Sequence, residues 1–205
     1  MIDHEVRRGD QPHVGGDDVT GASTFRLEKG LDTGPIFGVM TEAIQPTDTS
    51  GDLLHRLAVS GADLLSRTFA GLEDGSAVAQ PQQGEPTLAP TIATGQAQVD
   101  WSAPAFAVDR QIRAHTPAPG AWTILDGNRV KLGPVTRAPD QTPLAPGEIN
   151  NGFVGTGSHP VQLGWVAPAG KKAMDARDWL RGARLPEGTR FDLLQNTELD
   201  TRGDN

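Results

Sequence analysis

The apolar positions of the chain fall into two patterned parts, separated by residues 79–98, where they occur singly. In the first part, residues 20–27 and 36–44 are rich in β-branched and aromatic side chains, which is typical of strands. Residues 53–72 instead carry an apolar side chain every three or four positions, which predicts a helix. The order strand, loop, strand, helix fits the last part of an α/β sheet domain.

The predicted helix has a beginning, an end and one leucine-rich face. Residues 47–50 (TDTS) offer N-cap side chains, and Gly71 and Gly75 supply a stop. The leucine-rich face carries Leu53, Leu54, Leu57, Gly61, Leu64, Leu65 and Phe69. His55 lies off this face, on the side expected to meet solvent. If two strands and a helix stood alone, the leucine-rich face would stay exposed.

The second part begins with a predicted helix and continues as short strands. Ser102 is a candidate N-cap, with Phe106, Val108 and Ile112 on the side expected to be buried. Short apolar runs then alternate with turn signals at residues 121–125, 129–132, 147–149, 152–154 and 161–166. Asp126-Gly127 between the first two runs is a hairpin signal. Four to six short strands within about 50 residues favour a small antiparallel barrel, which residues 175–181 would close as a short helix.

These patterns predict five segments. They are an irregular head (1–15), the strand–loop–strand–helix unit (16–78), a partly extended linker (79–98), the barrel unit (99–195) and a flexible tail (196–205).

Composition excludes several classes of protein. The 205 residues include no cysteine, so disulfides and thiolate metal sites are impossible. We see no signal-peptide core and no apolar run long enough to span a bilayer, so a cytoplasmic protein without a membrane partner is expected. No two histidines have the spacing of a metal site, so no metal is expected.

Charge divides the chain unevenly. Residues 1–95 carry 6 Lys and Arg against 14 Asp and Glu, whereas residues 96–195 carry 11 against 9. The split is a pointer to different partners for the two parts. A surplus of two cations does not itself indicate nucleic acid, because any solvated face could carry it.

The loop between the first two strands holds the main candidate for chemistry. Gly30 and Gly34 can adopt backbone angles that other residues avoid, and they enclose Asp32. A carboxylate fixed on such a loop could be a general base or the partner of a histidine. Asp is equally an ordinary turn residue, because its side chain bonds the backbone two residues on.

Two sets of cations are candidate phosphate contacts. Lys171 and Lys172 lie in a glycine-containing loop, where they are either solvated turn residues or phosphate ligands. Arg110 and Arg113 stand three apart on a predicted helix and so share a face. They could be ordinary surface charge or part of a stripe that follows a nucleic-acid backbone.

Taken in order, these stretches resemble the later part of the methionyl-tRNA formyltransferase family. The stretches are Thr20-Gly21, residues 30–34 (GLDTG), residues 48–51 (DTSG), residues 112–114 (IRA) with Pro117, Pro119 and Trp122, and residues 168–174 (PAGKKAM). The resemblance runs in register from about residue 16 to residue 195.

The resemblance implies a fold and a reaction. The fold would be the C-terminal part of a Rossmann-type formyltransferase domain (16–78), followed by a C-terminal barrel similar to an OB-fold that binds tRNA (99–195). The reaction would move a formyl group from the co-substrate 10-formyltetrahydrofolate to the amino group of methionine on initiator tRNA. In this family an Asn, a His and an Asp act together. Only the Asp has a counterpart, Asp32, which would orient the His and help remove the proton from the attacking amine.

The family's Asn-x-His-x-Ser-Leu-Leu-Pro segment has no counterpart, and neither His4 nor His13 has its context. We therefore expect a family member that lacks its first half and is crippled in catalysis, since loss of a preorganised oxyanion donor typically costs a factor of about 100 to 1,000. Two alternatives stay open. The chain could be a tRNA-binding module without chemistry, or a related formyltransferase acting on another amine, such as a sugar nucleotide. A DNA partner is not expected.

Overall fold

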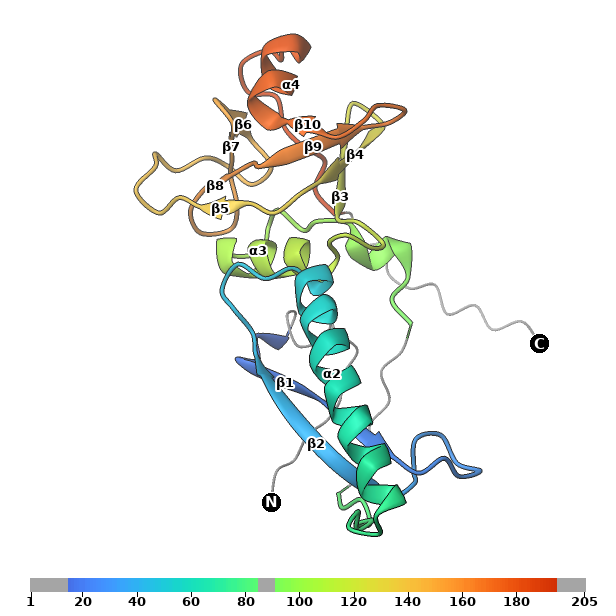
Figure 1. Cartoon of the computed structure of the whole chain (residues 1–205). Helices are drawn as coiled ribbons and strands as arrows, with labels where there is room; N and C mark the ends of the chain where they lie inside the picture. Colours follow the sequence, from blue (N-terminus) through green and yellow to red (C-terminus); the bar gives the residue numbers. More distant parts are fainter. Residues whose placement is uncertain (1–14, 85–90, 195–205) are drawn as a thin grey trace, which may run out of the picture. The chain divides into compact units, whose positions relative to one another are not determined.

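The computed structural model describes residues 15–84 and 91–194. The predictions for most of the head and for the tail lie outside these residues. Contacts divide the chain into two units (Figure 1). Unit 1 comprises the described residues up to Ile92 together with Arg113–Ala118, and unit 2 comprises Ala93–Ile112 and the described residues from Pro119 onward.

Unit 1 is a strand hairpin covered by one long helix. The strands β1 (Val19–Phe25) and β2 (Ile36–Ala43) are antiparallel, and the helix α2 (Ser50–Glu73) packs on both (Figure 1). The predicted order of strand, loop, strand and helix is therefore present. A Cβ on Gly38 would lie 3.0 Å from Cδ1 of Leu64, so the missing side chain allows helix and strand to approach closely.

The start of α2 follows from its sequence. Thr49 is the N-cap: its Oγ1 accepts a bond from the N–H of Asp52, and the Asp52 carboxylate accepts one from the N–H of Thr49. This reciprocal pair satisfies two N–H groups that a helix start otherwise leaves without partners. The TDTS stretch thus contains the cap that was predicted.

The leucine-rich face of α2 is only partly buried. Leu53 and Leu64 are buried, whereas Leu54, Leu65 and Phe69 are exposed by 52%, 45% and 57%. A two-stranded sheet is too narrow to cover a broad apolar stripe on a helix. The exposed leucine-rich face expected of a three-element unit is therefore what is found among the described residues.

Unit 2 contains two four-stranded antiparallel sheets and two α-helices around one core (Figure 1). One sheet has the order β10-β9-β4-β3 and the other β5-β8-β7-β6. The strands are β3 (Trp122–Leu125), β4 (Asn128–Leu132), β5 (Thr136–Arg137), β6 (Ile149–Asn150), β7 (Phe153–Val154), β8 (Val161–Gln162), β9 (Trp165–Pro168) and β10 (Met174–Asp175). The helices are α3 (Ala105–Ala114), of which the last two residues belong to unit 1, and α4 (Ala176–Ala183). Two strands, β5 and β10, were not predicted, because Thr136-Arg137 and Met174-Asp175 do not lie in an apolar run.

The hairpin predicted at Asp126-Gly127 is confirmed. Both residues have positive φ, 50° and 74°, the conformation that suits a two-residue turn between twisted strands. The turn places Trp122 opposite Lys131 and Ile124 opposite Arg129.

The core of unit 2 is aromatic at its centre. Trp101 and Phe191 stack with ring centroids 5.4 Å apart, and Trp179 stacks on Phe191 at 6.3 Å. Nε1 of Trp101 donates to Oγ1 of Thr123 at 2.9 Å, so the buried indole N–H has a partner. This core draws residues from both sheets and both helices.

The entry to α3 differs from the prediction. Ser102 is not the N-cap; its hydroxyl bonds the carboxylate of Asp100, and Oγ of Ser158 accepts the N–H of Ala105 instead. Val108 and Ile112 are buried as predicted, but Phe106 is 48% exposed. The cap comes from a residue 53 positions away, which no local pattern reveals.

The described parts of the predicted linker, residues 79–84 and 91–98, form backbone contacts. Gln80 pairs with Ile36 of β2, and a short 3-10 helix, η1 (Thr94–Ala97), precedes the bridge from Gln98 to Trp122. Unit 2 therefore begins at residue 93, before the predicted boundary at residue 99.

Candidate functional site

Asp32 lies at the tip of the loop that connects β1 and β2. The N–H of Arg26 donates to the carbonyl of Pro35 at 2.9 Å, which closes the base of the loop. Asp32 is exposed and has φ of 52°, the left-handed region that Asp tolerates better than most residues. The left-handed conformation that we expected of the flanking glycines thus falls on the acid itself.

Gly30 and Gly34 shape the loop through space rather than through φ. A Cβ on Gly34 would lie 1.8 Å from the carbonyl oxygen of Arg26, and one on Gly30 would lie 2.4 Å from Oγ1 of Thr33. Neither distance is possible for a real Cβ without a shift of the backbone or side chain. Each glycine is therefore required by a close approach.

Gln82 braces the same loop from a distant part of the sequence. Its Nε2 donates to the carbonyl oxygens of Asp32 and Gly34, both at 2.7 Å. Sequence reasoning missed Gln82, because it lies in a stretch that reads as linker. No sequence pattern marks Gln82. In the structure, Gln80, two residues earlier, pairs with Ile36 of β2 and so brings this stretch next to the loop. Together these contacts hold the backbone on either side of the Asp32 carboxylate.

The carboxylate of Asp32 makes no hydrogen bond or ion pair with the residues that the structure describes. Asp32 thus presents an exposed carboxylate on a braced loop. The histidine partner that the resemblance calls for is not among its contacts in the described ranges.

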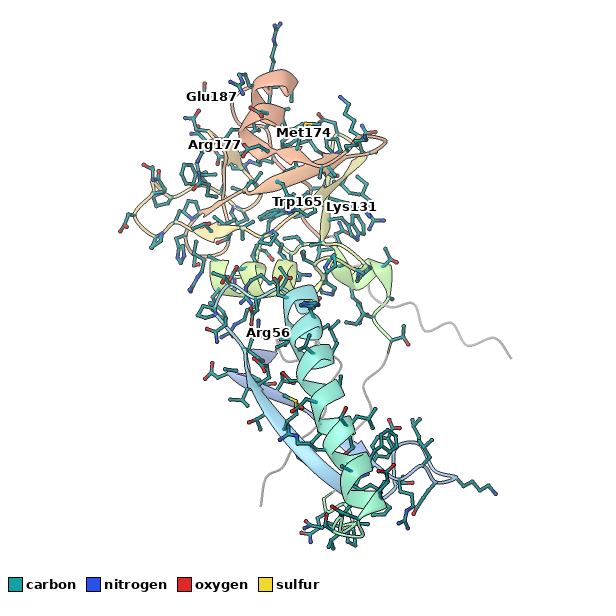
Figure 2. All side chains as sticks on the ribbon, in the orientation of Figure 1. Arg56, Lys131, Trp165, Met174, Arg177 and Glu187 are labelled. Carbon is teal, nitrogen blue, oxygen red and sulfur yellow. The ribbon has the colours of Figure 1, made fainter. Side chains whose placement is uncertain are left out.

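A second polar cluster in unit 1 surrounds Arg56, which sequence reasoning did not single out (Figure 2). Its two terminal nitrogens bond the two carboxylate oxygens of Asp48 at 2.7 and 2.5 Å, and its Nε bonds Glu42 at 3.0 Å. These bonds, above all those to Asp48, raise the pKa of Arg56 further above its ordinary value. The cluster joins α2 to β2 and to the turn before the helix, so it holds the unit together.

Arg113 belongs to unit 1 and is buried. It is 8% exposed, and its Nη1 donates to the carbonyl oxygen of Asp48 at 2.8 Å. Nearby, the carbonyl of Thr116 accepts bonds from Oγ of Ser50 at 2.7 Å and from the N–H of Gly51 at 3.1 Å. An arginine so enclosed offers little surface to a phosphate. The expected stripe shared by Arg110 and Arg113 is therefore not formed.

The remaining candidate cations are in unit 2. Arg110 is half-buried, with its guanidinium 5.4 Å from the ring centroid of Phe106. Lys171 and Lys172 are exposed in the turn between β9 and β10, where the N–H of Lys171 donates to the carbonyl of Pro168 at 2.9 Å. None of these three cations forms an ion pair with a carboxylate of the described ranges.

The histidines of the described residues lie in different surroundings. His55 is exposed, as predicted, and His115 is buried directly after the end of α3. Within residues 15–84 and 91–194, no group of three or more His, Asp or Glu could hold a metal ion. Among the same residues, no helix combines the length and the apolar character that crossing a membrane requires.

The sequence and the fold of the chain are similar to those of known proteins. A family profile described as "Formyl transferase, C-terminal domain" matches residues 91–184. The chain carries a formyl transferase C-terminal domain. It is also a relative of the methionyl-tRNA formyltransferases, so the resemblance seen in the sequence is confirmed.

Two such relatives show the extent of the match. The methionyl-tRNA formyltransferase of Streptomyces griseus subsp. griseus is 58% identical over 181 residues, which are 85% of this chain and 58% of the relative. That of Thermobifida fusca is 55% identical over 181 residues, 86% of this chain and again 58% of the relative. The chain thus spans somewhat less than three fifths of the length of these formyltransferases.

Solved structures share the fold of this formyltransferase relative. HypX from Aquifex aeolicus, in complex with tetrahydrofolic acid, aligns with a TM-score of 0.70 at 17% identity over 84% of this chain and 32% of HypX. A methionyl-tRNA formyltransferase from Clostridium thermocellum aligns with a TM-score of 0.53 at 18% identity, over 65% of this chain and 57% of that protein.

Proposed function

We propose that this chain takes part in the formylation of initiator methionyl-tRNA, with 10-formyltetrahydrofolate as the co-substrate. The observation that carries the proposal is the identity of 52–58% to proteins named methionyl-tRNA formyltransferase. Structures of the same fold, HypX with tetrahydrofolic acid and WlaRD with 5-N-formyl-THF, support a folate as the formyl donor. A role in translation initiation would place the protein in the cytoplasm.

Asp32 would serve the attacking amine. In the reaction the amine nitrogen attacks the formyl carbon and loses a proton, while the bond from that carbon to the folate nitrogen breaks and the folate nitrogen gains a proton. A carboxylate on a braced loop suits the removal of that proton, directly or through a histidine. Gly30 and Gly34 would support this role by allowing the backbone contacts that fix the loop.

The proposal also includes a fold type for each of the two units. Two four-stranded antiparallel sheets around one core support an OB-like barrel for residues 99–195. The hairpin and α2 would be the C-terminal part of a Rossmann-type catalytic domain. The tRNA would contact Lys171, Lys172 and Arg110, which have no carboxylate partner in the described ranges. Arg113, buried against Asp48, would support the structure and would not touch the tRNA.

A transfer assay with 10-formyltetrahydrofolate and methionyl-tRNA tests the catalytic role. We expect Asp32→Asn to lower whatever turnover the full chain shows by a factor of about 100 or more. The matched control is Asp17→Asn, which removes an exposed carboxylate near β1 and should leave turnover unchanged. Equal turnover of Asp32→Asn and the unmodified protein would contradict the role of Asp32.

A second candidate function is a tRNA-binding module without chemistry. It is favoured by one contrast: Asp32 has no catalytic partner in the described ranges, whereas unit 2 has a closed core. This candidate predicts salt-dependent binding of tRNA without formyl transfer. Charge reversal of Lys171, Lys172 and Arg110 should weaken the binding; if affinity does not depend on salt, the candidate fails.

A related formyltransferase acting on another amine remains the third candidate, because sugar N-formyltransferases such as WlaRD share the fold. Assays with methionyl-tRNA and with an amino sugar nucleotide, run side by side, separate the two acceptors. Formylation of the sugar alone would replace the main proposal.

A further inference from the structure

The outer face of the sheet β10-β9-β4-β3 differs in character from the core face. Inward positions of its strands are buried: Thr123, Leu125, Val130, Leu132 and Val166. Outward positions are half-buried or exposed: Trp122, Ile124, Arg129, Lys131, Trp165 and Ala167. The outward set of β3, β4 and β9 thus contains two tryptophans, two cations and no carboxylate.

Trp122 and Arg129 form a stacked pair on this face. The guanidinium carbon of Arg129 lies 4.1 Å from the ring centroid of Trp122, within the range of a cation–π contact. Nε1 of Trp122 donates to the carbonyl of Thr94 at 2.8 Å, which fixes the orientation of the indole. Nε of Arg129 is buried and has no hydrogen-bond partner among the described residues. The pair is therefore preformed, and one of its polar atoms is unsatisfied.

Lys131 and Trp165 extend the face across the next strand (Figure 2). Lys131 is paired in register with Trp122 on one side and with Ala167 of β9 on the other. Trp165 packs where a side chain of Gly133 would stand, because a Cβ there would lie 2.1 Å from the indole ring. Gly133 therefore lets the second tryptophan lie close to the sheet beside Lys131.

The loop with the two other lysines begins at the same place. The N–H of Ala169 donates to the carbonyl of Arg129 at 3.0 Å, so the β9–β10 turn with Lys171 and Lys172 starts next to the stacked pair. Asp175, opposite Trp165 on β10, already accepts the N–H of Arg177 at 2.8 Å. Two further carboxylates border this face: Asp126 lies in the hairpin turn, and the N–H of Asp192 donates to the carbonyl of Ile124 at 2.9 Å. In a chain of net charge −8, such a concentration of cations is complementary to an anion.

We propose that this aromatic-basic face, formed by Trp122, Arg129, Lys131, Trp165, Lys171 and Lys172, binds an unpaired segment of RNA. Bases would stack on the indole and guanidinium surfaces, and phosphates would contact the lysines. A duplex hides the faces of its bases, so stacking of this kind selects single-stranded nucleotides. The proposal rests on tRNA as the partner of unit 2, and it names where the unpaired part of that RNA would lie.

Fluorescence anisotropy with three probes tests the proposal on the full chain. The probes are initiator tRNA, a short unstructured RNA oligonucleotide and an RNA duplex of the same length. The variants are Trp122→Leu, Arg129→Gln, Lys131→Gln and a double variant that combines Lys171→Gln with Lys172→Gln. The matched control is Arg137→Gln, which removes an exposed arginine from the other sheet of unit 2. Thermal unfolding of each variant shows whether it keeps its fold. If Trp122→Leu does not fold, Arg129→Gln and Lys131→Gln decide the test, because they leave the buried face of the sheet unchanged.

We expect the unstructured oligonucleotide to bind more tightly than the duplex. Trp122→Leu should weaken that binding about tenfold, since one stacking partner of the bases is lost. Lys131→Gln should lower the slope of log affinity against log salt by about 0.7 for one lost phosphate contact. Arg137→Gln should change neither quantity.

Four results would overturn the proposal, and the last of them would overturn the proposed function as well. One is equal or tighter binding of the duplex; another is binding of an oligoglutamate peptide as tight as that of RNA, which would identify an acidic protein as the partner. The third is tRNA binding that needs Lys171 and Lys172 but is indifferent to Trp122, Arg129 and Lys131, which refutes this face while leaving the tRNA partner intact. If no tRNA binds at all, both the face and the proposed function fail.

Discussion

The two units of the chain bury their apolar side chains to very different degrees. Unit 2 encloses a continuous core that includes Trp101, Phe191 and the inward positions of both sheets. Among the described residues of unit 1, the buried apolar side chains are Leu53, Leu64 and Ala114. Of the 13 large apolar side chains that are exposed, 10 belong to unit 1 and only Phe106, Leu193 and Leu194 to unit 2.

The difference follows from the number of layers in each unit. Unit 2 has sheets and helices on several sides of its core, so each apolar face meets another. Among its described residues, unit 1 has one helix on one two-stranded sheet, and no further layer covers the other side of the helix. Polar contacts hold unit 1 together instead: the Arg56 cluster, the capping box at Thr49 and the bond between Thr24 and Thr68 of 2.7 Å.

The largest contrast should come from removing one aromatic ring in each unit. Phe191→Ala deletes a ring that is 1% exposed and stacks on two tryptophans. The free energy of unfolding of unit 2 should therefore fall by about 3–5 kcal/mol. Phe69→Ala, at 57% exposure in unit 1, should cost less than about 0.5 kcal/mol. Urea titration followed by tryptophan fluorescence suits the first, because all four tryptophans lie in unit 2; far-UV circular dichroism reports both. Similar losses for the two variants would contradict the contrast in burial.

Substitution of alanine for glycine should change the free energy of unfolding in opposite directions at two positions. Gly133→Ala forces a methyl group into the ring of Trp165 and should destabilise unit 2 by about 1–3 kcal/mol. Gly61→Ala places a methyl 3.9 Å from Cβ of Ala22 in the middle of α2, where it should stabilise unit 1 by about 0.5–1 kcal/mol. Unfolding curves of the two single variants give the signs, and a destabilised Gly61→Ala would show that α2 and β1 are packed more tightly than this distance indicates.

Removal of the capping box should lower stability by an intermediate amount, and only in unit 1. Thr49→Ala removes the hydroxyl that accepts the N–H of Asp52, so α2 should lose about 1 kcal/mol. Hydrogen exchange of the first turn of α2 should speed up, while amides of the unit 2 sheets should exchange at their former rate. Thr49→Ser, which keeps the hydroxyl, is the matched control; loss of protection there as well would show that the methyl group matters more than the cap.

The smallest expected effect is a dependence on pH at the same cap. Bonds from Thr49 lower the pKa of the Asp52 carboxyl below its ordinary value. The stabilisation is therefore complete above the pKa of the unfolded chain and is lost as the pH falls through the lower folded-state pKa. Between about pH 6 and pH 3, the unmodified protein should lose slightly more helix stability than Asp52→Asn, since other carboxyl groups titrate equally in both. An identical loss in the two proteins would mean that the bond to Thr49 does not favour the charged carboxylate.

Local patterns were enough for the elements that have local causes. The strands at 20–27 and 36–44, the helix after TDTS and the Asp126-Gly127 hairpin all appear within a few residues of their predicted bounds. Each is specified by neighbours along the chain: a period, a cap or a turn residue. The glycines around Asp32 were also noticed, although the physical reason is a close approach of Arg26 and Thr33 and not a positive φ.

The candidate site was less accessible to local reasoning. Lys171 and Lys172 were found because a charged pair in a glycine-containing loop is visible in sequence. Arg113 was misplaced on an exposed face, since helical spacing cannot show that its end of α3 lies in unit 1. Trp122, Arg129, Lys131 and Trp165 were not recognised together, because strand pairing alone makes them neighbours.

The sequence by itself determined the order of elements, the position of the acidic loop and the kinship with the methionyl-tRNA formyltransferases. These features depend on residue types at fixed short spacings, which can be recognised without knowing how the chain packs. Only the tertiary structure decided which apolar residues are covered, that Gln82 braces the loop of Asp32 and that two tryptophans share a face with basic side chains. Those facts come from contacts between residues far apart in the chain, and such contacts leave no periodic mark on the sequence.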